Sequence, residues 1–202
     1  MKRILLFLFC ILSIVAYSQK KDKREGNYSL KLQSVEAPKS IELGKIDSLT
    51  STYEDLLIKI NWQYAVSQLG FDLTNKTDET IKVIWDDAAF ISTTNESSRV
   101  FHKGVKYIDR ENPQAPTTIY KSTTLSDLIS PTTYTTYVSG KYGGWNSKPL
   151  IQTPSSVWSS KVEYKPELLE KTVRVALPLK KGEEIYEYMF EFKTVFIEKE
   201  KK

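Results

Sequence analysis

The sequence predicts an all-β fold, a single antiparallel β-sandwich with long loops. Apolar and polar residues alternate over short segments, as in Ile58-Lys59-Ile60-Asn61-Trp62, and this period is typical of strands with one buried face. Aromatic residues make up 12% of the chain, and their bulk suits the half-buried surface of a sheet. No strand and helix patterns alternate over a long stretch, which argues against a parallel sheet.

Residues 1–18 have the pattern of a cleaved signal peptide. Lys2 and Arg3 give a positive start, residues 4–15 are almost wholly apolar, and Ala16-Tyr17-Ser18 places small residues at the positions that signal peptidase recognises. The apolar run is shorter than the roughly 20 residues that span a bilayer. We therefore expect export in a bacterium, to the periplasm or the outer membrane, with no integral membrane span after cleavage.

Cleavage before Gln19 would divide the remaining chain into three parts. We expect a charged linker over residues 19–27, the sandwich domain over 28–197 and a charged tail over 198–202. Cys10 lies inside the apolar run among bulky neighbours, so a lipid-modified cysteine is the less favoured alternative.

Composition argues against several classes of chemistry. The chain without its leader has no cysteine, and its 27 basic and 25 acidic residues give little field to attract nucleic acid. His102 is the only histidine, whereas a zinc site needs several His or Cys ligands. Neither a Gly-x-Ser-x-Gly elbow nor a glycine-rich phosphate loop occurs. We expect no enzyme activity, no cofactor and no nucleic-acid partner.

Alternation predicts the strands of the first half of the chain. One strand is expected over residues 28–35 and another over 57–66, while residues 44–55 are left as a loop or as one to two helical turns. Residues 69–73 and 81–85 alternate on either side of a polar turn. This pattern predicts a β-hairpin, with Trp62 and Trp85 in the core.

The second half contains long polar connections. Residues 92–118 are expected to form two loops around a brief strand at 99–101, and residues 140–149 form a third loop because of their glycines. Thr/Tyr-rich residues 132–138 and residues 157–162 are candidate strands. The clearest element is a hairpin that turns at residues 180–184 between long alternating arms.

The order of these segments resembles a known type of domain. The segments are Ile60-Asn61-Trp62, Phe71-Asp72-Leu73-Thr74-Asn75-Lys76-Thr77, Ile81-Lys82-Val83-Ile84-Trp85-Asp86 and the closing Leu177-Pro178-Leu179. Over about residues 56–197 they are similar to the Ig-like β-sandwich domains of uncharacterised bacterial envelope proteins and water-stress proteins. The resemblance implies an Ig-like scaffold and brings no catalytic residues with it.

Clustered acids suggest one candidate metal site. Asp86, Asp87 and Asp109, near His102, would form an oxygen-rich cation site if one end of the sandwich gathered them. Adjacent residues of a strand point to opposite faces, so Asp86 and Asp87 converge only across a bulge. The alternative is that these acids bond to the local backbone or pair with nearby basic residues, namely Arg99, Lys103 or Arg110.

Aromatic residues in the polar connections suggest a binding surface. Trp145 lies among glycines and polar residues, and with Tyr137 and Tyr142 it would form a ligand-stacking or protein-contact platform. His102 and Tyr107 add candidate contacts from residues 92–118. The alternative is that Trp145 folds back over the end of the sandwich.

These features favour a non-catalytic envelope protein that binds a protein partner through loops 92–118 and 140–149. Long connections are costly to order unless they carry recognition. A carbohydrate- or glycan-binding module is the alternative. A glycan binder needs a planar row of exposed aromatic rings, whereas a protein binder needs a contiguous apolar patch or a free strand edge.

Overall fold

The computed structural model describes residues 25–152 and 164–199. The predicted leader, most of the predicted linker and the candidate strand at 157–162 lie outside these residues. The described chain is all-β: it has 14 strands and four short 3₁₀ helices, and no α-helix within those two ranges.

Eight strands make up the first part of the chain: β1 (Gly26–Glu36), β2 (Lys45–Asp47), β3 (Thr52–Glu54), β4 (Ile58–Ala65), β5 (Gln68–Asn75), β6 (Ile81–Val83), β7 (Ala89–Ile91) and β8 (Ser97–His102). Six follow: β9 (Thr117–Ile119), β10 (Thr124–Pro131), β11 (Thr135–Val138), β12 (Gly144–Ser147), β13 (Thr172–Lys181) and β14 (Glu184–Glu198). The 3₁₀ helices are η1 (Trp85–Asp87), η2 (Tyr107–Asp109), η3 (Thr132–Tyr134) and η4 (Pro166–Leu168).

Twelve of the strands form one antiparallel network that nearly closes into a barrel. The order is β1-β14-β13-β7-β8-β10-β5-β4-β3-β2, and β6 and β9 branch from β13. At the open seam the Leu32 amide of β1 donates to Ser51 Oγ at 3.2 Å, and Lys31 Nζ donates to the Leu49 carbonyl at 2.7 Å. These bonds occupy groups of the edge strand β1 that would otherwise be unpaired.

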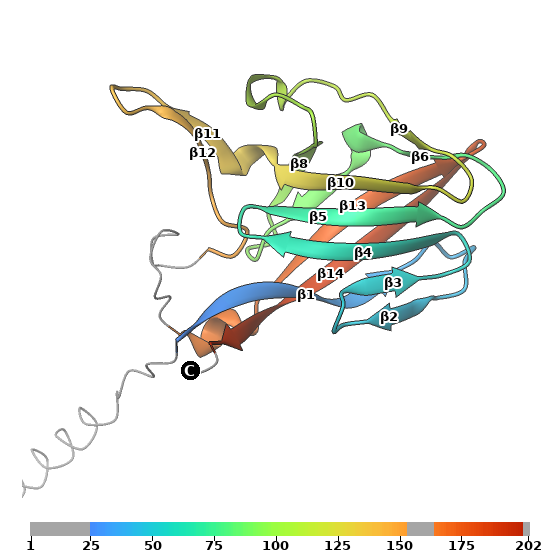
Figure 1. Ribbon diagram of the computed structural model, residues 1–202, viewed down its shortest axis with the longest axis horizontal. Coiled ribbons are helices and arrows are strands. Elements are labelled where there is room, and N and C mark those ends of the chain that lie inside the picture. Colours follow the sequence, from blue (N-terminus) through green and yellow to red (C-terminus); the bar gives the residue numbers. More distant parts are fainter. Residues whose placement is uncertain (1–24, 153–163, 200–202) are drawn as a thin grey trace, which may run out of the picture.

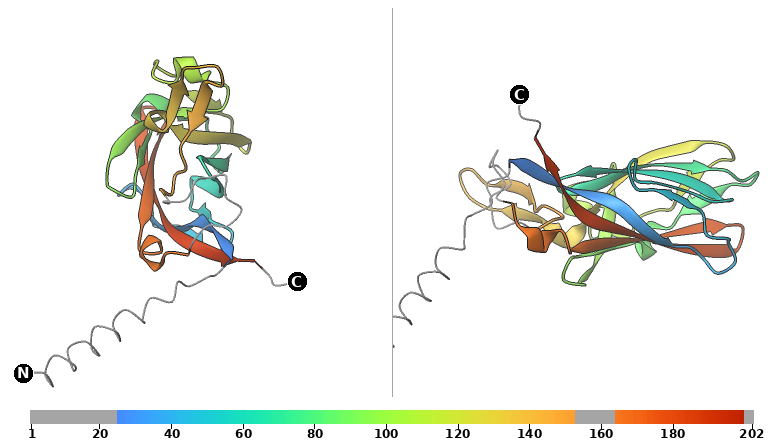
Figure 2. Two further views of the ribbon diagram at one scale, coloured as in Figure 1. Left: turned by 90° about the vertical axis from the view of Figure 1, so that its left-hand side faces the viewer. Right: turned by 90° about the horizontal axis from the view of Figure 1, so that it is seen from below.

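The two halves of this network cross one another in space. In Figure 1, β4, β5 and β10 lie in front of β13 and β14 and cross them obliquely, while the β11–β12 hairpin projects from one corner. Figure 2 shows β1 and β14 running together, and the Lys199 amide donates to the Glu25 carbonyl at 2.9 Å. The two ends of the described chain therefore leave the molecule side by side.

One hydrophobic core fills the space between the crossing halves. Its largest fully buried side chains include Trp85, Tyr53, Tyr188 and Phe190. Trp62 packs its ring within 5.1–5.3 Å of the Phe71, Phe190 and Phe192 rings. The predicted core positions of Trp62 and Trp85 are confirmed, because both are buried in this cluster.

The prediction of a β-hairpin that turns at residues 75–79 is wrong. β5 pairs with β4 and β10, whereas β6 pairs with β13 and β9. Asn75 directs this crossing, since its buried amide donates to the carbonyls of Glu79 and Ile119 at 2.7 and 3.1 Å. Alternation identified both strands, but it does not distinguish a tight turn from a connection to a different set of strands.

Three other local predictions also need correction. Residues 44–55 form the β2–β3 hairpin rather than a loop or helical turns, and their strands of three residues are too short to show a period. The predicted strand at 132–138 begins with the 3₁₀ helix η3 and becomes β11 only at Thr135. The predicted loop around Trp145 is instead strand β12, paired with β11.

The strands predicted from the most regular alternation are confirmed. β13 and β14 form the predicted C-terminal hairpin, β4 matches the strand expected from residue 57, and β8 contains the brief strand at 99–101. β1 begins at Gly26, two residues before the expected start of the domain.

Candidate functional site

A projecting hairpin presents three aromatic residues of the predicted surface. Tyr137 of β11 lies directly opposite Trp145 of β12, so their side chains share one face. The ring centroids are 5.5 Å apart with an interplanar angle of 67°. The tight return needs glycine, because a Cβ on Gly143 would lie 2.2 Å from the Val138 carbonyl oxygen.

The β8–β9 connection adds a third ring to this face. η2 presents Tyr107, whose ring centroid lies 5.7 Å from that of Trp145 at 61°. On its other side Tyr107 packs edge-on against the buried Phe101 of β8, at 5.7 Å and 81°. Tyr107 therefore connects the exposed hairpin to the body of the protein.

A guanidinium group completes the cluster. The central carbon of the Arg110 guanidinium lies 5.1 Å from the centroid of the Trp145 ring, within range of a cation–π interaction. Arg110 Nε donates to the Thr132 carbonyl at 3.2 Å, and another guanidinium nitrogen donates to the Tyr107 carbonyl at 2.9 Å. These two bonds hold the planar group in position.

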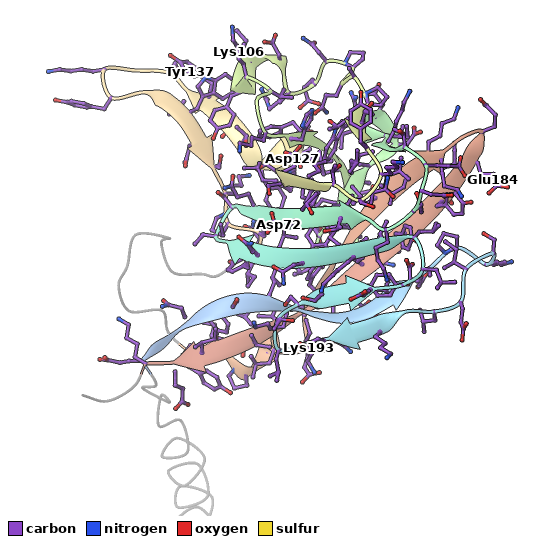
Figure 3. The ribbon with its side chains drawn as sticks, turned by 45° about the vertical axis from the view of Figure 1, so that its right-hand side comes forward. Asp72, Lys106, Asp127, Tyr137, Glu184 and Lys193 are labelled. Atoms are coloured by element: carbon purple, nitrogen blue, oxygen red, sulfur yellow. The ribbon has the colours of Figure 1, made fainter. Side chains whose placement is uncertain are left out.

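We call Tyr107, Arg110, Tyr137 and Trp145 the aromatic platform. Its rings remain open to solvent: Trp145 is 39% exposed, Tyr107 43% and Tyr137 62%. The two predicted binding loops thus contribute to one surface, although Tyr107 and Trp145 are 38 residues apart in sequence. In Figure 3, Tyr137 and Lys106 lie at the same end of the molecule, far from Glu184 and Lys193.

Tyr142 does not join the platform. It lies in the turn between β11 and β12, is 92% exposed, and its described ring contact is with Lys141 Nζ at 5.4 Å from the centroid. The hairpin therefore carries one aromatic residue at its tip and two on its platform face.

His102 is an internal residue rather than an exposed contact. Its imidazole stacks on the buried Trp85 ring, with centroids 4.2 Å apart and an interplanar angle of 2°. Nδ1 lies 3.1 Å from Asp127 Oδ2, and the two side chains are only 17% and 6% exposed. Strand β8 directs the Phe101 and His102 side chains to opposite sides. The contact of His102 with Trp85 depends on how β8 packs in the folded protein, which the sequence pattern does not show.

Asp127 links this internal pair to the start of the loop. Its Oδ1 accepts hydrogen bonds from the Lys103 amide at 2.9 Å and from the Leu128 amide at 2.7 Å. An Asp–His pair also occurs in nucleophilic hydrolases. Among the described residues, however, no serine or threonine hydroxyl hydrogen-bonds to the imidazole of His102.

The acids predicted to bind a cation are not brought together. Asp86 Oδ1 accepts from Arg99 at 2.8 Å and from the Gln114 amide at 3.0 Å, while Asp109 accepts from Asn112 at 3.2 Å. Within the described residues no group of three or more His, Cys, Asp or Glu side chains is placed to hold a metal ion. The alternative that Asp86 pairs with a nearby basic residue is therefore confirmed for Arg99.

Asp87 instead borders an open groove elsewhere on the molecule. The groove, of about 790 Å³, runs over the outer face of β13 and β14 beside the segment 36–40. Its walls include Pro38, Ala176, Pro178 and Met189. None of the platform residues lines it.

Comparison with known proteins returned nothing similar: no family model matches the chain, and neither the curated proteins nor the solved structures gave a match. No helix in the described part of the chain is long and apolar enough to cross a membrane.

Arg110 of the platform and the Phe101 ring that supports Tyr107 were not identified as site residues from the sequence. Arg110 follows Tyr107 by three residues, a spacing that one 3₁₀ turn brings to the same side. Phe101 is buried beneath Tyr107. Recognising Arg110 would have required predicting η2, which is a single turn and has no periodic pattern.

Proposed function

We propose that this protein is a non-catalytic, exported envelope protein that binds a protein partner through the aromatic platform. The observation that carries the proposal is an exposed tryptophan between two tyrosines and an anchored arginine. Tryptophan, tyrosine and arginine dominate the binding energy of protein interfaces. Tryptophan and tyrosine combine a large contact area with only two side-chain torsions.

The ring geometry favours a protein over a sugar. The Tyr107 and Tyr137 rings are inclined at 61° and 67° to the Trp145 ring, so the three do not offer a coplanar row for sugar faces. A glycan-binding module that uses Trp145 and the protruding Tyr142 remains the alternative. It has weaker support, since Tyr142 lies outside the cluster.

Export is the second part of the proposal. It is supported by the sequence of residues 1–18, with its basic start, apolar run and small residues before Gln19. We place the mature protein in the periplasm or at the outer membrane of a bacterium. The adjacent ends of the described chain would put a leader or its linker on one side of the fold.

The scaffold is the third part. We propose an Ig-like sandwich, supported by the passage of the chain from β5 to β6, which pair with different sets of strands. Such crossings between two antiparallel sheets are typical of Greek-key sandwiches. The platform then occupies one end of the sandwich, where connecting loops carry recognition in such folds.

Capture from an envelope fraction tests the function. The tagged mature chain should retain a partner that Trp145→Ala and Tyr107→Ala lose, because each change removes a central ring of the platform. Tyr142→Ala, on the same hairpin, is the matched control and should capture normally. Melting temperatures of the three variants should stay within a few degrees of wild type.

Two outcomes would contradict the proposal. Equal capture by the wild type and both platform variants would move the contact surface elsewhere. Loss of capture by Tyr142→Ala, together with elution by free oligosaccharide, would favour the glycan-binding alternative.

A further inference from the structure

The two segments that supply the platform contain more basic than acidic residues. The segments 103–111 and 137–148, which supply its side chains, contain five basic residues and two acidic ones. Over residues 19–202 as a whole the basic excess is only two. Outside these two segments acidic residues slightly outnumber basic ones, although residues 20–24 also contain four basic residues and one acidic one.

These basic groups are available to a ligand. Lys103, Lys106, Lys141 and Lys148 are all exposed. None of the four forms an ion pair with a described residue. Among the described residues, the ion pair of Arg110 is with Glu111 at 3.6 Å, whose side chain is 55% exposed. An approaching anion would therefore meet cations whose charge is not already neutralised within the protein.

The hairpin also offers unpaired backbone. β11 and β12 form a two-stranded sheet of their own, and neither pairs with any other strand of the described chain. An extended peptide can continue such a sheet by main-chain hydrogen bonds, with alternate side chains meeting its face. In this case the face carries Tyr137 and Trp145.

We propose that the occupant of the platform is an extended, acidic segment of a protein partner, with apolar side chains on Trp145 and its tyrosines and carboxylates toward Arg110 and the lysines of the two segments. This inference rests on the proposed function and adds the chemistry of the partner. Complementary charge would accelerate association and fix the orientation of the segment.

The test uses labelled synthetic peptides of alternating residues with the purified mature chain. Fluorescence polarisation compares a Glu/Val peptide with a Lys/Val peptide and a Gln/Val peptide, and with polygalacturonate as a competing anion. The Glu/Val peptide should bind, with a Kd that rises about tenfold between about 50 mM and about 300 mM NaCl, because salt screens exposed charges.

Matched variants locate the contact. The double change Lys106→Glu and Lys148→Glu should weaken binding of the Glu/Val peptide about tenfold. Lys39→Glu with Lys45→Glu makes the same change in net charge away from the platform and should alter the Kd by less than about twofold. Trp145→Ala should weaken binding more than Tyr142→Ala.

Failure of this inference is distinguishable from failure of the proposed function. Equal binding of the three peptides, no binding of the Glu/Val peptide, or a Kd independent of salt would overturn the acidic partner, even if Trp145→Ala still abolished envelope capture. Stronger binding of polygalacturonate than of the peptide would replace the peptide by an anionic polysaccharide. Unchanged capture by the platform variants would instead refute the proposed function itself.

Discussion

Asp55 is a buried carboxylate that joins distant parts of the chain. Its Oδ2 accepts hydrogen bonds from the Tyr188 hydroxyl at 2.8 Å and the Tyr53 hydroxyl at 3.0 Å. Its Oδ1 accepts from the amides of Leu57 and Ile58, both at 2.8 Å. With four donors and little exposure, this carboxylate connects β14 to the turn between β3 and β4.

Removal of this carboxylate should be costly. Asp55→Ala would leave two buried tyrosine hydroxyls and two amides without their acceptor, at a cost of about 3 kcal/mol in the free energy of unfolding. Urea denaturation would measure the loss. Asp78→Ala, at an exposed turn position, is the control and should change stability by less than about 0.5 kcal/mol. A similarly small effect at position 55 would contradict this role.

The same tyrosines predict a loss of stability at high pH. Burial raises the pKa of Tyr53 to about 12, an effect to which the Asp55 charge adds, and burial alone raises the pKa of Tyr64 to about 12. Burial, followed by the Asp55 charge, also raises the pKa of Tyr188. Unfolded tyrosines ionise near pH 10. The stability due to these neutral phenols is complete below about pH 10 and decreases as the pH approaches about 12.

Denaturant melts between about pH 9 and about pH 12 would measure this decrease. Tyr53→Phe should make the free energy of unfolding less dependent on pH, because one perturbed phenol is removed. Absorbance at the phenolate wavelength should show a fraction of tyrosines that ionises only with unfolding. A pH dependence identical in wild type and variant would show that Tyr53 is not the responsible group.

At the scale of elements, the β13–β14 hairpin shows how a turn residue fixes register. Lys181 pairs with Glu184, so only Gly182 and Glu183 make the return, and Gly182 has a φ of +57°. Glycine at the first central position is typical of a type II′ turn, whose twist matches that of the flanking strands. The turn aligns ten residue pairs along the two arms.

Substitution of this glycine should act through the backbone alone. A Cβ on Gly182 would meet no atom within 4 Å, so Gly182→Ala should cost about 1 kcal/mol from the positive φ. Gly182→Asn should cost less, because asparagine tolerates this region better. Thermal melts of both variants would check the order; a greater loss with asparagine would argue for side-chain contacts.

The β11–β12 hairpin has a different character. Its strands are four residues long and their outer faces are exposed. At its base Thr135 Oγ1 hydrogen-bonds to Ser147 Oγ and the Lys148 amide donates to the Tyr134 carbonyl, and on its platform face Trp145 packs against Tyr107 of the body. An element with so little burial contributes little to global stability and is free to serve recognition.

At the scale of the whole molecule, Trp85 holds several elements together. Its indole packs on Phe71 of β5 and stacks on His102 of β8, and its Nε1 donates to Thr117 Oγ1 of β9 at 2.8 Å. The ring therefore fixes the way in which the two halves of the network cross.

Trp85→Ala should consequently destabilise the fold by about 3–5 kcal/mol, because it leaves a large cavity. Trp85→Phe, which retains most of the ring, should cost less. Denaturant melts would measure both, and a loss below about 1 kcal/mol for the alanine variant would show that the core does not depend on this residue.

The sequence alone determined the all-β class and the elements with long, regular alternation. β4, β5 and the β13–β14 hairpin could be predicted because side-chain period is a local property that burial imposes on a strand. The core positions of Trp62 and Trp85 and a surface containing Tyr107, Tyr137 and Trp145 were predictable from the same patterns of apolar and polar neighbours.

Only the tertiary structure decided which segments meet. Strand pairing depends on contacts between residues far apart in sequence, so β5 and β6 were expected to pair and instead belong to different sets of strands. For the same reason His102 was predicted to be a surface contact, although it stacks on Trp85, and Arg110 was not predicted to belong to the platform. These positions depend on short turns and on packing between distant strands, which local alternation does not encode.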